Sequence, residues 1–421
     1  MKASKYNIYI ENSNKYYIYN QITQALNEFS KDFFFVLKDS LPLSDIDESE
    51  KELLKDKNFI CDKDLQEENI ILCKNRMQRY ENRLARMTVM PTLECNFKCW
   101  YCYESHIKSQ MDEKVIKSII LFAKKIIAQN KLSHFILDWF GGEPLLYFNE
   151  VMYPISKEIM NLCKQENISF LHSITTNGYL ITPDSVKLMK EINLNKFQIT
   201  LDGSAKFHNK TRFSDTDKNT YSTIVRNIEL LCNEIKDVDM TVRINYTPQN
   251  MHTIDDIALS FNENIRNKIE ITPQLVWQYK NKEKINKKDD LINEKLKYFK
   301  ESGYKIKDGF APVRGCYVEN MLQFVVNYDG ALYKCTARDF NNKQYSIGKL
   351  SEDGDFIPNS NYYRYFTSSD FENPTCLACN LLPSCLGGSC IQKKLEQEPF
   401  SCMKDDIYSS LVNRLLSIIN K

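Results

Sequence analysis

Between about residue 87 and residue 275, short apolar runs alternate with amphipathic segments. The runs with the length and composition of strands are Met87–Met90, Phe135–Phe140, Leu171–Thr175, Lys196–Leu201, Met240–Tyr246 and Ile269–Leu275. The segments with apolar residues at helical spacing are Glu113–Ala128, Val151–Gln165, Pro183–Glu191 and Thr220–Ile235. Strands that alternate with helices are typical of a parallel sheet. We therefore predict an α/β fold whose functional residues lie where strands end and loops begin.

The first 85 residues have a different pattern. Residues 6–19 form two aromatic and β-branched runs around a polar turn, which predicts a β-hairpin. The apolar side chains of residues 22–33 then recur at helical spacing, and the acidic segment 44–55 predicts a second helix. We expect a small separate domain here. Residues 279–300 are rich in lysine and aspartate and indicate a solvated helical linker.

Composition describes an ordinary soluble protein and excludes several classes of partner. The 421 residues are 43% hydrophobic and 26% charged, with a net charge of +1. So small a net charge gives no basic field for nucleic acid or an anionic membrane surface. The N-terminus has no signal-peptide pattern, and no apolar run approaches the roughly 18 residues of a membrane span. We expect a cytoplasmic protein with no nucleic-acid or membrane partner.

Cysteine is the residue that departs from this ordinary picture. There are 14 cysteines, and they cluster at two places along the chain. Disulfides are rare in a reducing compartment, so metal binding or catalysis fits better. Cys61, Cys73, Cys163 and Cys232 lie outside the clusters. Of these, Cys163 and Cys232 lie on apolar helical faces and are most simply core residues.

The first cluster contains Cys95, Cys99 and Cys102, with three residues in the first interval and two in the second. Three thiolates leave one iron of a 4Fe-4S cube free for an outside ligand. Part of a structural zinc site, or three small core residues, is the alternative interpretation. The spacing resembles the radical S-adenosylmethionine (SAM) superfamily. That resemblance implies that SAM chelates the open iron and is cleaved reductively to a 5'-deoxyadenosyl radical.

Further motifs extend the resemblance to the branch that contains anaerobic sulfatase-maturating and peptide-modifying enzymes. Gly141-Gly142-Glu143 follows a predicted strand, and the resemblance implies that this loop binds the amino end of SAM. As a plain turn, the same loop would mean little. The segments 172–178 and 198–203 follow in the order that this branch has.

The resemblance also assigns three side chains to SAM. It implies that Ser173 and Arg212 hold the SAM carboxylate, because a guanidinium offers a bidentate fork. Tyr101 occupies the aromatic position beside the adenine. Each of the three also has a structural alternative, as a strand-end hydroxyl, a helix-start ion pair and a half-buried tyrosine.

The second cysteine cluster, beyond residue 315, resembles the SPASM extension that carries two auxiliary 4Fe-4S clusters. The resemblance implies an outer cluster and an inner cluster, with the respective ligands Cys376, Cys379, Cys385 and Cys402, and Cys316, Cys335 and Cys390. Seven thiols exceed the four of one zinc site. Two departures stand out. Four residues, instead of the usual three, separate Cys385 from Cys390. The sulfatase-maturating branch also has an additional cysteine where Val313–Gly315 stand here, and an aspartate base where Thr336 stands.

The resemblance implies a fold and a division of the chain. The fold is a partial (β/α)6 TIM-type barrel with a small N-terminal winged-helix-like α+β domain and a C-terminal cysteine-rich auxiliary-cluster domain. Residues 1–85 would recognise a leader peptide, 86–300 form the barrel, 301–404 form the SPASM domain and 405–421 form a terminal helix. The alternative for residues 1–85 is a layer that only covers the barrel.

The implied enzyme is a maturase that crosslinks a ribosomally made precursor peptide, with a cysteine thioether as the first choice. It would use SAM, three 4Fe-4S clusters and an external electron donor of the flavodoxin or ferredoxin type. Three alternatives stay open: formylglycine formation in a sulfatase, carbon–carbon crosslinking of a peptide, and a non-catalytic iron–sulfur carrier. The sequence leaves the catalytic base unassigned.

Overall fold

The computed structural model describes residues 1–43, 46–276, 278, 289–306, 316–367, 373–386, 402 and 404–420. The chain divides into two compact units, and each is described by itself. Asn82–Asp308 and Leu322–Tyr362 form the barrel unit; Met1–Glu81, Gly309–Met321 and Tyr363–Lys421 form the terminal unit. The predicted domain 301–404 is therefore shared between both units. No helix of the described residues is long and apolar enough to cross a bilayer.

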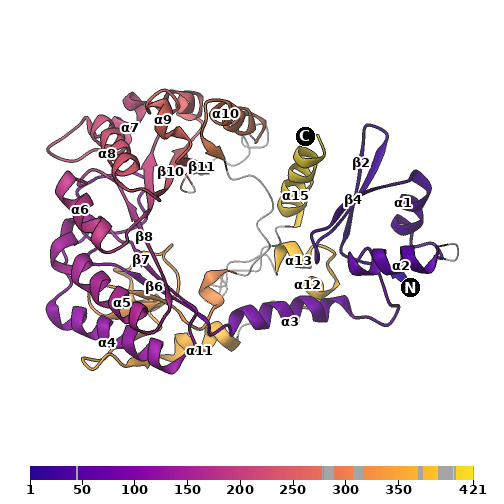
Figure 1. The fold of residues 1–421 in the computed structure, drawn as a ribbon, viewed down its shortest axis with the longest axis horizontal. Helices are drawn as coiled ribbons and strands as arrows, with labels where there is room; N and C mark the ends of the chain where they lie inside the picture. The colour runs from indigo at the N-terminus through magenta and orange to yellow at the C-terminus, as the bar shows by residue number, and fades with distance from the viewer. Residues whose placement is uncertain are drawn as a thin grey trace. The chain divides into compact units, whose positions relative to one another are not determined.

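The barrel unit is built on a sheet whose central six strands are parallel (Figure 1). These strands are β6 (Leu84–Val89), β7 (His134–Trp139), β8 (Ser169–Thr176), β9 (Lys196–Leu201), β10 (Asp239–Tyr246) and β11 (Ile269–Leu275). They lie in chain order, and each neighbouring pair is parallel in register. The six strands predicted from the apolar runs, and the α/β class, are therefore confirmed.

Helices follow these strands along the chain. Those that the helical spacing predicted are α4 (Glu113–Gln129), α5 (Tyr153–Gln165), α6 (Pro183–Glu191) and α8 (Thr220–Glu234). The short α7 (Ala205–Thr211) and α9 (Glu263–Arg266) were not predicted, and α10 (Asp289–Glu301) follows β11. Their starts follow from local chemistry. Asp112 caps α4 by accepting a hydrogen bond from the Val115 amide, and Thr182 with Ser185 forms a capping box at α6. A π-helical turn over Phe148–Met152 shortens the predicted helix at 151 by two residues.

Four short strands extend the barrel sheet beyond β6. They are β13 (Gln323–Val326), β14 (Ala331–Tyr333), β15 (Gly348–Leu350) and β16 (Phe356–Pro358). Strand β13 pairs parallel with β6, and the other three continue antiparallel. At the opposite edge, β12 (Lys305–Ile306) pairs with β11. None of these strands was predicted, because elements of two to four residues leave too short a pattern to recognise.

The terminal unit contains the predicted hairpin. Strands β2 (Asn7–Asn12) and β3 (Lys15–Asn20) pair antiparallel through a two-residue turn at Ser13 and Asn14, which both have positive φ. The predicted helix over residues 22–33 is partly wrong, because β4 (Leu26–Phe29) adds to β3 and only α1 (Lys31–Lys38) is helical. The strand forms there because β3 offers main-chain hydrogen-bond partners, with Tyr19 opposite Leu26 and Tyr16 opposite Phe29. The winged-helix-like character of this domain stays a prediction.

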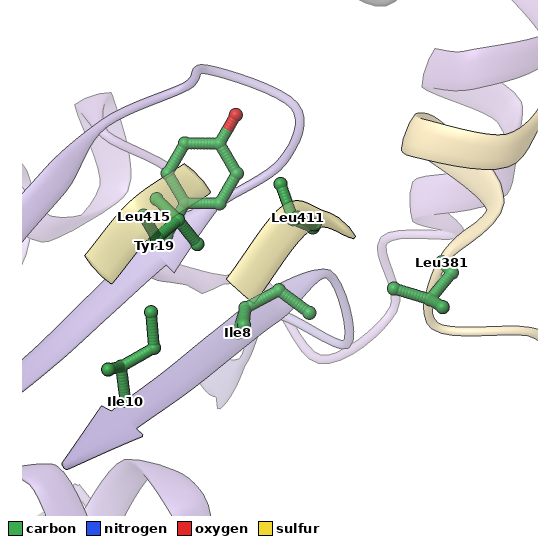
Figure 2. Packing of buried hydrophobic residues seen from close by; sticks show 6 residues of the cluster. All are labelled: Ile8, Ile10, Tyr19, Leu381, Leu411 and Leu415. Carbon is green, nitrogen blue, oxygen red and sulfur yellow. The ribbon is translucent and has the colours of Figure 1, made fainter. Parts of the chain in front are cut away.

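The remaining helices of the terminal unit are α2 (Glu48–Asp56), α3 (Glu67–Arg79), α12 (Pro374–Ala378), α13 (Leu382–Cys385) and α15 (Lys404–Ile419). A short β1 (Lys2–Ala3) pairs with β5 (Ile60–Cys61), and α11 (Ser360–Thr367) spans the boundary of the units. Figure 2 shows how the C-terminal helix α15 packs on the N-terminal hairpin. Leu411 and Leu415 of α15 pack on Ile8, Ile10 and Tyr19 of the hairpin. The two ends of the chain therefore share one hydrophobic core.

Candidate functional site

A cavity lies at the carboxyl ends of the parallel strands in the barrel unit. The loop after β6 contributes all three cysteines of the first cluster to its wall. The same loop contributes Tyr101 and Glu104. Loops and strand ends from β7 to β11 contribute other residues, which include Gly141, Gly142, Thr175, Gln198, Thr200, Arg212, Arg243, Asn245 and Gln278. Ligand sites in parallel α/β sheets form at this edge, where successive loops converge. The structure thus gathers residues that are 183 positions apart, from Cys95 to Gln278, around one space.

Of the three cysteines of the β6 loop, Cys95 and Cys99 are partly buried and Cys102 is exposed. Burial raises the pKa of all three thiols, that of Cys99 to about 11, so the metal-free protein holds them neutral. Metal binding reverses this, because a cation stabilises the thiolate. The Phe97 amide already donates a hydrogen bond to Cys95 Sγ, at 3.4 Å. Donors of this kind tune the sulfurs of iron–sulfur clusters.

Two cysteines of the second cluster accept the same kind of hydrogen bond. The Ala337 amide donates to Cys335 Sγ at 3.3 Å, and the Leu381 amide donates to Cys379 Sγ at 3.4 Å. Among the described residues, no group of three or more candidate ligands is close enough to share one metal ion.

Gly141 and Gly142 let the β7 loop press against the cysteine loop. A Cβ atom on Gly142 would lie 2.1 Å from the backbone oxygen of Glu94, and Gly141 has a φ of +113°. The contact is fixed by the Glu143 amide, which donates to the Glu94 carbonyl at 2.8 Å. No residue with a side chain fits at position 142 without moving the cysteine loop. The glycine pair is needed for this approach and not only for a turn.

The structure places the Glu143 carboxylate away from the cavity wall. It is 1% exposed, and it accepts hydrogen bonds from Thr176 Oγ1 at 2.7 Å, the Asn177 amide at 2.8 Å and the Leu145 amide at 3.1 Å. Burial raises the pKa of this carboxyl, while the Thr176 and amide hydrogen bonds lower it. These contacts hold the glycine loop against the end of β8. The Glu143 carboxylate, which the resemblance assigns to the amino group of SAM, therefore does not face the cavity in this structure.

Ser173 also lies away from the cavity. Its hydroxyl donates to Asp138, which forms an ion pair with Arg86 at 3.0 Å. Thr175, two residues later on the same face of β8, lines the cavity. Side chains two apart on a strand are about 7 Å apart along it, so Ser173 sits one layer too deep. Thr200 at the end of β9 also lines the cavity.

Tyr101 and Arg212 meet in a buried network at the cavity wall. Arg212 Nη1 and Asn245 Nδ2 donate to the Tyr101 hydroxyl at 2.7 and 3.1 Å, and this hydroxyl donates to Asp202 at 2.7 Å. Burial raises the pKa of Asp202 to about 6, although Arg212 opposes the shift. Both assigned residues thus reach the cavity. The hydroxyl of Tyr101 is fully used by its neighbours, which leaves its ring for contact with a ligand.

Several polar atoms around the cavity have no partner among the described residues. They are Arg212 Nε, Glu104 Oε1 and Gln278 Oε1, all buried. Buried polar atoms left without hydrogen bonds are costly, so they mark the place of an absent polar ligand. Burial raises the pKa of Glu104 to about 8. A nucleotide-sized molecule with amino, carboxylate and hydroxyl groups matches these orphan groups, and so SAM fits this wall.

Four residues of this wall were not assigned from the sequence: Glu104, Thr200, Arg243 and Gln278. Two of them had a sequence signal, because Thr200 lies inside the segment 198–203 that carried the resemblance and Glu104 lies two residues after Cys102. Arg243 and Gln278 lie at positions with no motif around them.

The second cysteine cluster is distributed over both units. The terminal unit contains Cys376, Cys379, Cys385 and Cys402. Burial raises the pKa of Cys376 most, and the charges of Cys379 and Cys402 raise it further. Cys335 belongs to the barrel unit and Cys316 to the terminal unit. Cys390 lies outside the described residues. The four cysteines assigned to the outer cluster therefore share one unit.

Comparisons with known proteins match this site. Residues 89–261 match the model of the radical SAM superfamily. A cysteine-type anaerobic sulfatase-maturating enzyme of Clostridium novyi is 27% identical over 330 residues, which cover 70% of this chain and 84% of the relative. The radical SAM cyclopropyl synthase TigE of Paramaledivibacter caminithermalis is 24% identical over 390 residues, covering 82% of this chain and 76% of the relative.

Solved structures show the same fold. The enzyme anSMEcpe with bound AdoMet and Cp18Cys peptide superposes with a TM-score of 0.59 at 18% identity, over 80% of this chain and 99% of its own. Streptococcus suis SuiB bound to the precursor peptide SuiA superposes with a TM-score of 0.53 at 15% identity, over 95% of this chain and 98% of its own. The second likeness extends over nearly the whole chain.

Proposed function

This chain carries a radical SAM domain, and we propose from that premise that it is a maturase that modifies a ribosomally made precursor peptide. The observation that carries the proposal is the cavity wall. It brings Cys95, Cys99 and Cys102 together with the glycine loop and with the orphan nitrogen of Arg212. A 4Fe-4S cluster held by these thiolates, with SAM, supplies hydrogen-atom abstraction through a 5'-deoxyadenosyl radical.

The residues of the chain orient the ligand and exclude water. Gly141 and Gly142 offer backbone at the wall, and Arg212 presents a guanidinium whose position is fixed through Tyr101 and Asp202. We assign the hydroxyl beside the SAM carboxylate to Thr175 or Thr200 in place of Ser173. Three threonines line the cavity with Arg212, and the third, Thr176, already donates its hydroxyl to Glu143. A charge-assisted hydrogen bond to a carboxylate is of the stronger kind.

Capture of the peptide leader falls to the terminal unit in this proposal. Its sheet has the order β2-β3-β4, so β2 and β4 each have one paired neighbour among the described strands. An extended peptide can add to such an edge through main-chain hydrogen bonds. The likeness to SuiB, which includes the N-terminal part of this chain, supports the assignment.

The bond that is formed is the finer part of the proposal, and a cysteine thioether remains our first choice. Per bridge, the carbon loses a hydrogen atom, the thiol loses a proton, and one surplus electron leaves. Clusters bound by the C-terminal cysteines supply an acceptor for that electron. Formylglycine formation is the second candidate, favoured by the 27% identity to a sulfatase-maturating enzyme. It requires a base where Thr336 stands, which is the argument against it.

The test uses full-length protein reconstituted anaerobically with iron and sulfide. With dithionite and SAM, the wild type should form 5'-deoxyadenosine, and Cys99→Ser should form none. A non-catalytic carrier would form none in either case. Co-expression with candidate precursor peptides then separates the products. A thioether gives a mass loss of two hydrogens and a thiol that no longer alkylates, whereas formylglycine gives an aldehyde.

A further inference from the structure

Tyr6, in the N-terminal domain, carries a buried hydroxyl without a visible purpose. Its side chain is 0% exposed and packs with Ile71, Cys376 and Leu382 in one hydrophobic cluster. The hydroxyl oxygen is fully enclosed and has no hydrogen-bond partner among the described residues. A hydroxyl buried without a partner is costly, and a phenylalanine would fill the same space. The hydroxyl therefore points to a partner outside the described residues.

The outer cysteine motif surrounds this position. Gln21 Nε2 donates to the Asn380 carbonyl at 2.8 Å, Gln21 Oε1 accepts from Ser384 Oγ at 2.7 Å, and Lys5 Nζ donates to the Leu377 carbonyl at 2.9 Å. These three bonds join the first residues of the chain to the segment 376–385. The motif is thus built directly against Tyr6.

Leu381 adds an apolar connection between the same parts. Its amide donates to Cys379 Sγ, and its side chain is 0% exposed in the core with Ile8 and Ile10 of the hairpin (Figure 2). One residue thereby touches both a proposed cluster ligand and the sheet assigned to peptide capture. Any movement of the cysteine motif must displace this core.

The polar groups around Tyr6 are occupied with one another. Glu67 accepts hydrogen bonds from Ser4, Asn58 and the Lys5 amide, and Glu68 accepts one from Lys5 Nζ. A phenol hydroxyl can donate one hydrogen bond, and no described residue accepts it from Tyr6.

We propose that the Tyr6 hydroxyl donates a hydrogen bond to a sulfur of the outer iron–sulfur cluster, which is assigned to Cys376, Cys379, Cys385 and Cys402, so that the N-terminal domain forms part of the surroundings of that cluster. The inference rests on the proposed function, because it takes the outer cluster as given. Hydrogen bonds to cluster sulfurs stabilise the reduced, more negative state. Tyr6 thus tunes the outer cluster and makes the fold of the N-terminal domain depend on it.

The test compares Tyr6→Phe with Tyr9→Phe in full-length, anaerobically reconstituted protein. Tyr9 is the matched control, since its hydroxyl donates to the Leu37 carbonyl at 3.0 Å, away from the cysteines. Replacing the three barrel cysteines by alanine in every sample removes the signal of the SAM cluster. The outer cluster is then identified in a spectroscopic redox titration as the signal that Cys379→Ser removes.

In Tyr6→Phe, this signal should shift to lower potential, with about a two- to tenfold change in the ratio of oxidised to reduced cluster at a fixed potential. Tyr9→Phe should leave it unchanged. Hydrogen exchange over residues 2–12 provides a second readout. Removal of iron by a chelator should lower protection there in the wild type and in Tyr9→Phe. In Tyr6→Phe, removal of iron should lower this protection less, because the hydrogen bond between residue 6 and the cluster is already absent.

Two outcomes would overturn the inference, and they are distinguishable. A signal that is present but has the same potential in Tyr6→Phe removes the role of Tyr6 and leaves the proposed function intact. A wild type in which Cys379→Ser removes no signal shows that the outer cluster is absent, which overturns the cluster assignment and this inference together.

Discussion

Gly142→Ala tests whether the glycine loop sets the position of the cysteine loop. The new Cβ would lie 2.1 Å from the Glu94 carbonyl oxygen and 2.5 Å from that of Leu93, which are backbone atoms that cannot rotate aside. An ordinary C···O approach is about 3.3 Å, so the chain before Cys95 must move by about 1 Å. Overpacking of this kind costs about 1–3 kcal/mol. A displacement of 1 Å at a reacting centre costs about a hundredfold in rate.

The matched control is Gly303→Ala, at the end of α10. Its φ of +94° strains any side chain by about 1–2 kcal/mol, yet the new Cβ meets only Arg266 at 3.8 Å. Both variants should therefore lose stability in urea unfolding. Only Gly142→Ala should lose most 5'-deoxyadenosine formation, together with iron bound by the barrel unit. Wild-type turnover and iron content in Gly142→Ala would refute the argument from close approach.

Three further predictions follow from the described contacts. Thr200→Val should weaken SAM binding about tenfold in equilibrium dialysis, as expected for a lost charge-assisted hydrogen bond, and Ser173→Ala should leave the binding unchanged. The reverse result would restore the assignment of Ser173 to the SAM carboxylate. Leu415→Ala should destabilise the terminal unit by about 2–5 kcal/mol and speed hydrogen exchange in the hairpin. Tyr408 lies on the same helix and is 42% exposed, so Tyr408→Ala should have neither effect, and equal effects would argue against the shared core. The pKa of Asp202 is about 6 in the folded protein and about 4 in the unfolded chain, so the stability that its proton contributes is complete below pH 4 and is lost as pH rises through 6. In urea unfolding, the wild type should therefore lose up to about 3 kcal/mol relative to Asp202→Asn between pH 4 and 8, and a constant difference would contradict this.

Much of the barrel unit could be predicted from the sequence, because long periodic segments report their own burial. All six parallel strands and the four main helices stand where the apolar patterns placed them. The terminal unit was harder. Residues 22–33 have helical spacing, but β4 forms within them because the edge of β3 offers main-chain partners. Tertiary context overrode a weak local preference.

The candidate site shows the same division. The loop of Cys95, Cys99 and Cys102 could be predicted from spacing, because these three cysteines lie within eight residues of the chain. The assignments of Ser173 and Glu143 came from motif position, and the fold turns both side chains away from the cavity wall. On a strand, a difference of two residues moves a side chain one layer, which a motif cannot register.

The sequence by itself determined the cysteine loop, the glycine pair beside it and the alternation of strands and helices, because these depend on residues that are neighbours in the chain. Only the tertiary structure decided which hydroxyls reach the cavity, which buried atoms are left without partners, and that Tyr6 packs against a cysteine 370 positions later. Such contacts depend on the packing of distant segments into one core, and that packing minimises exposed apolar surface over the whole unit. No local pattern in the chain carries that information.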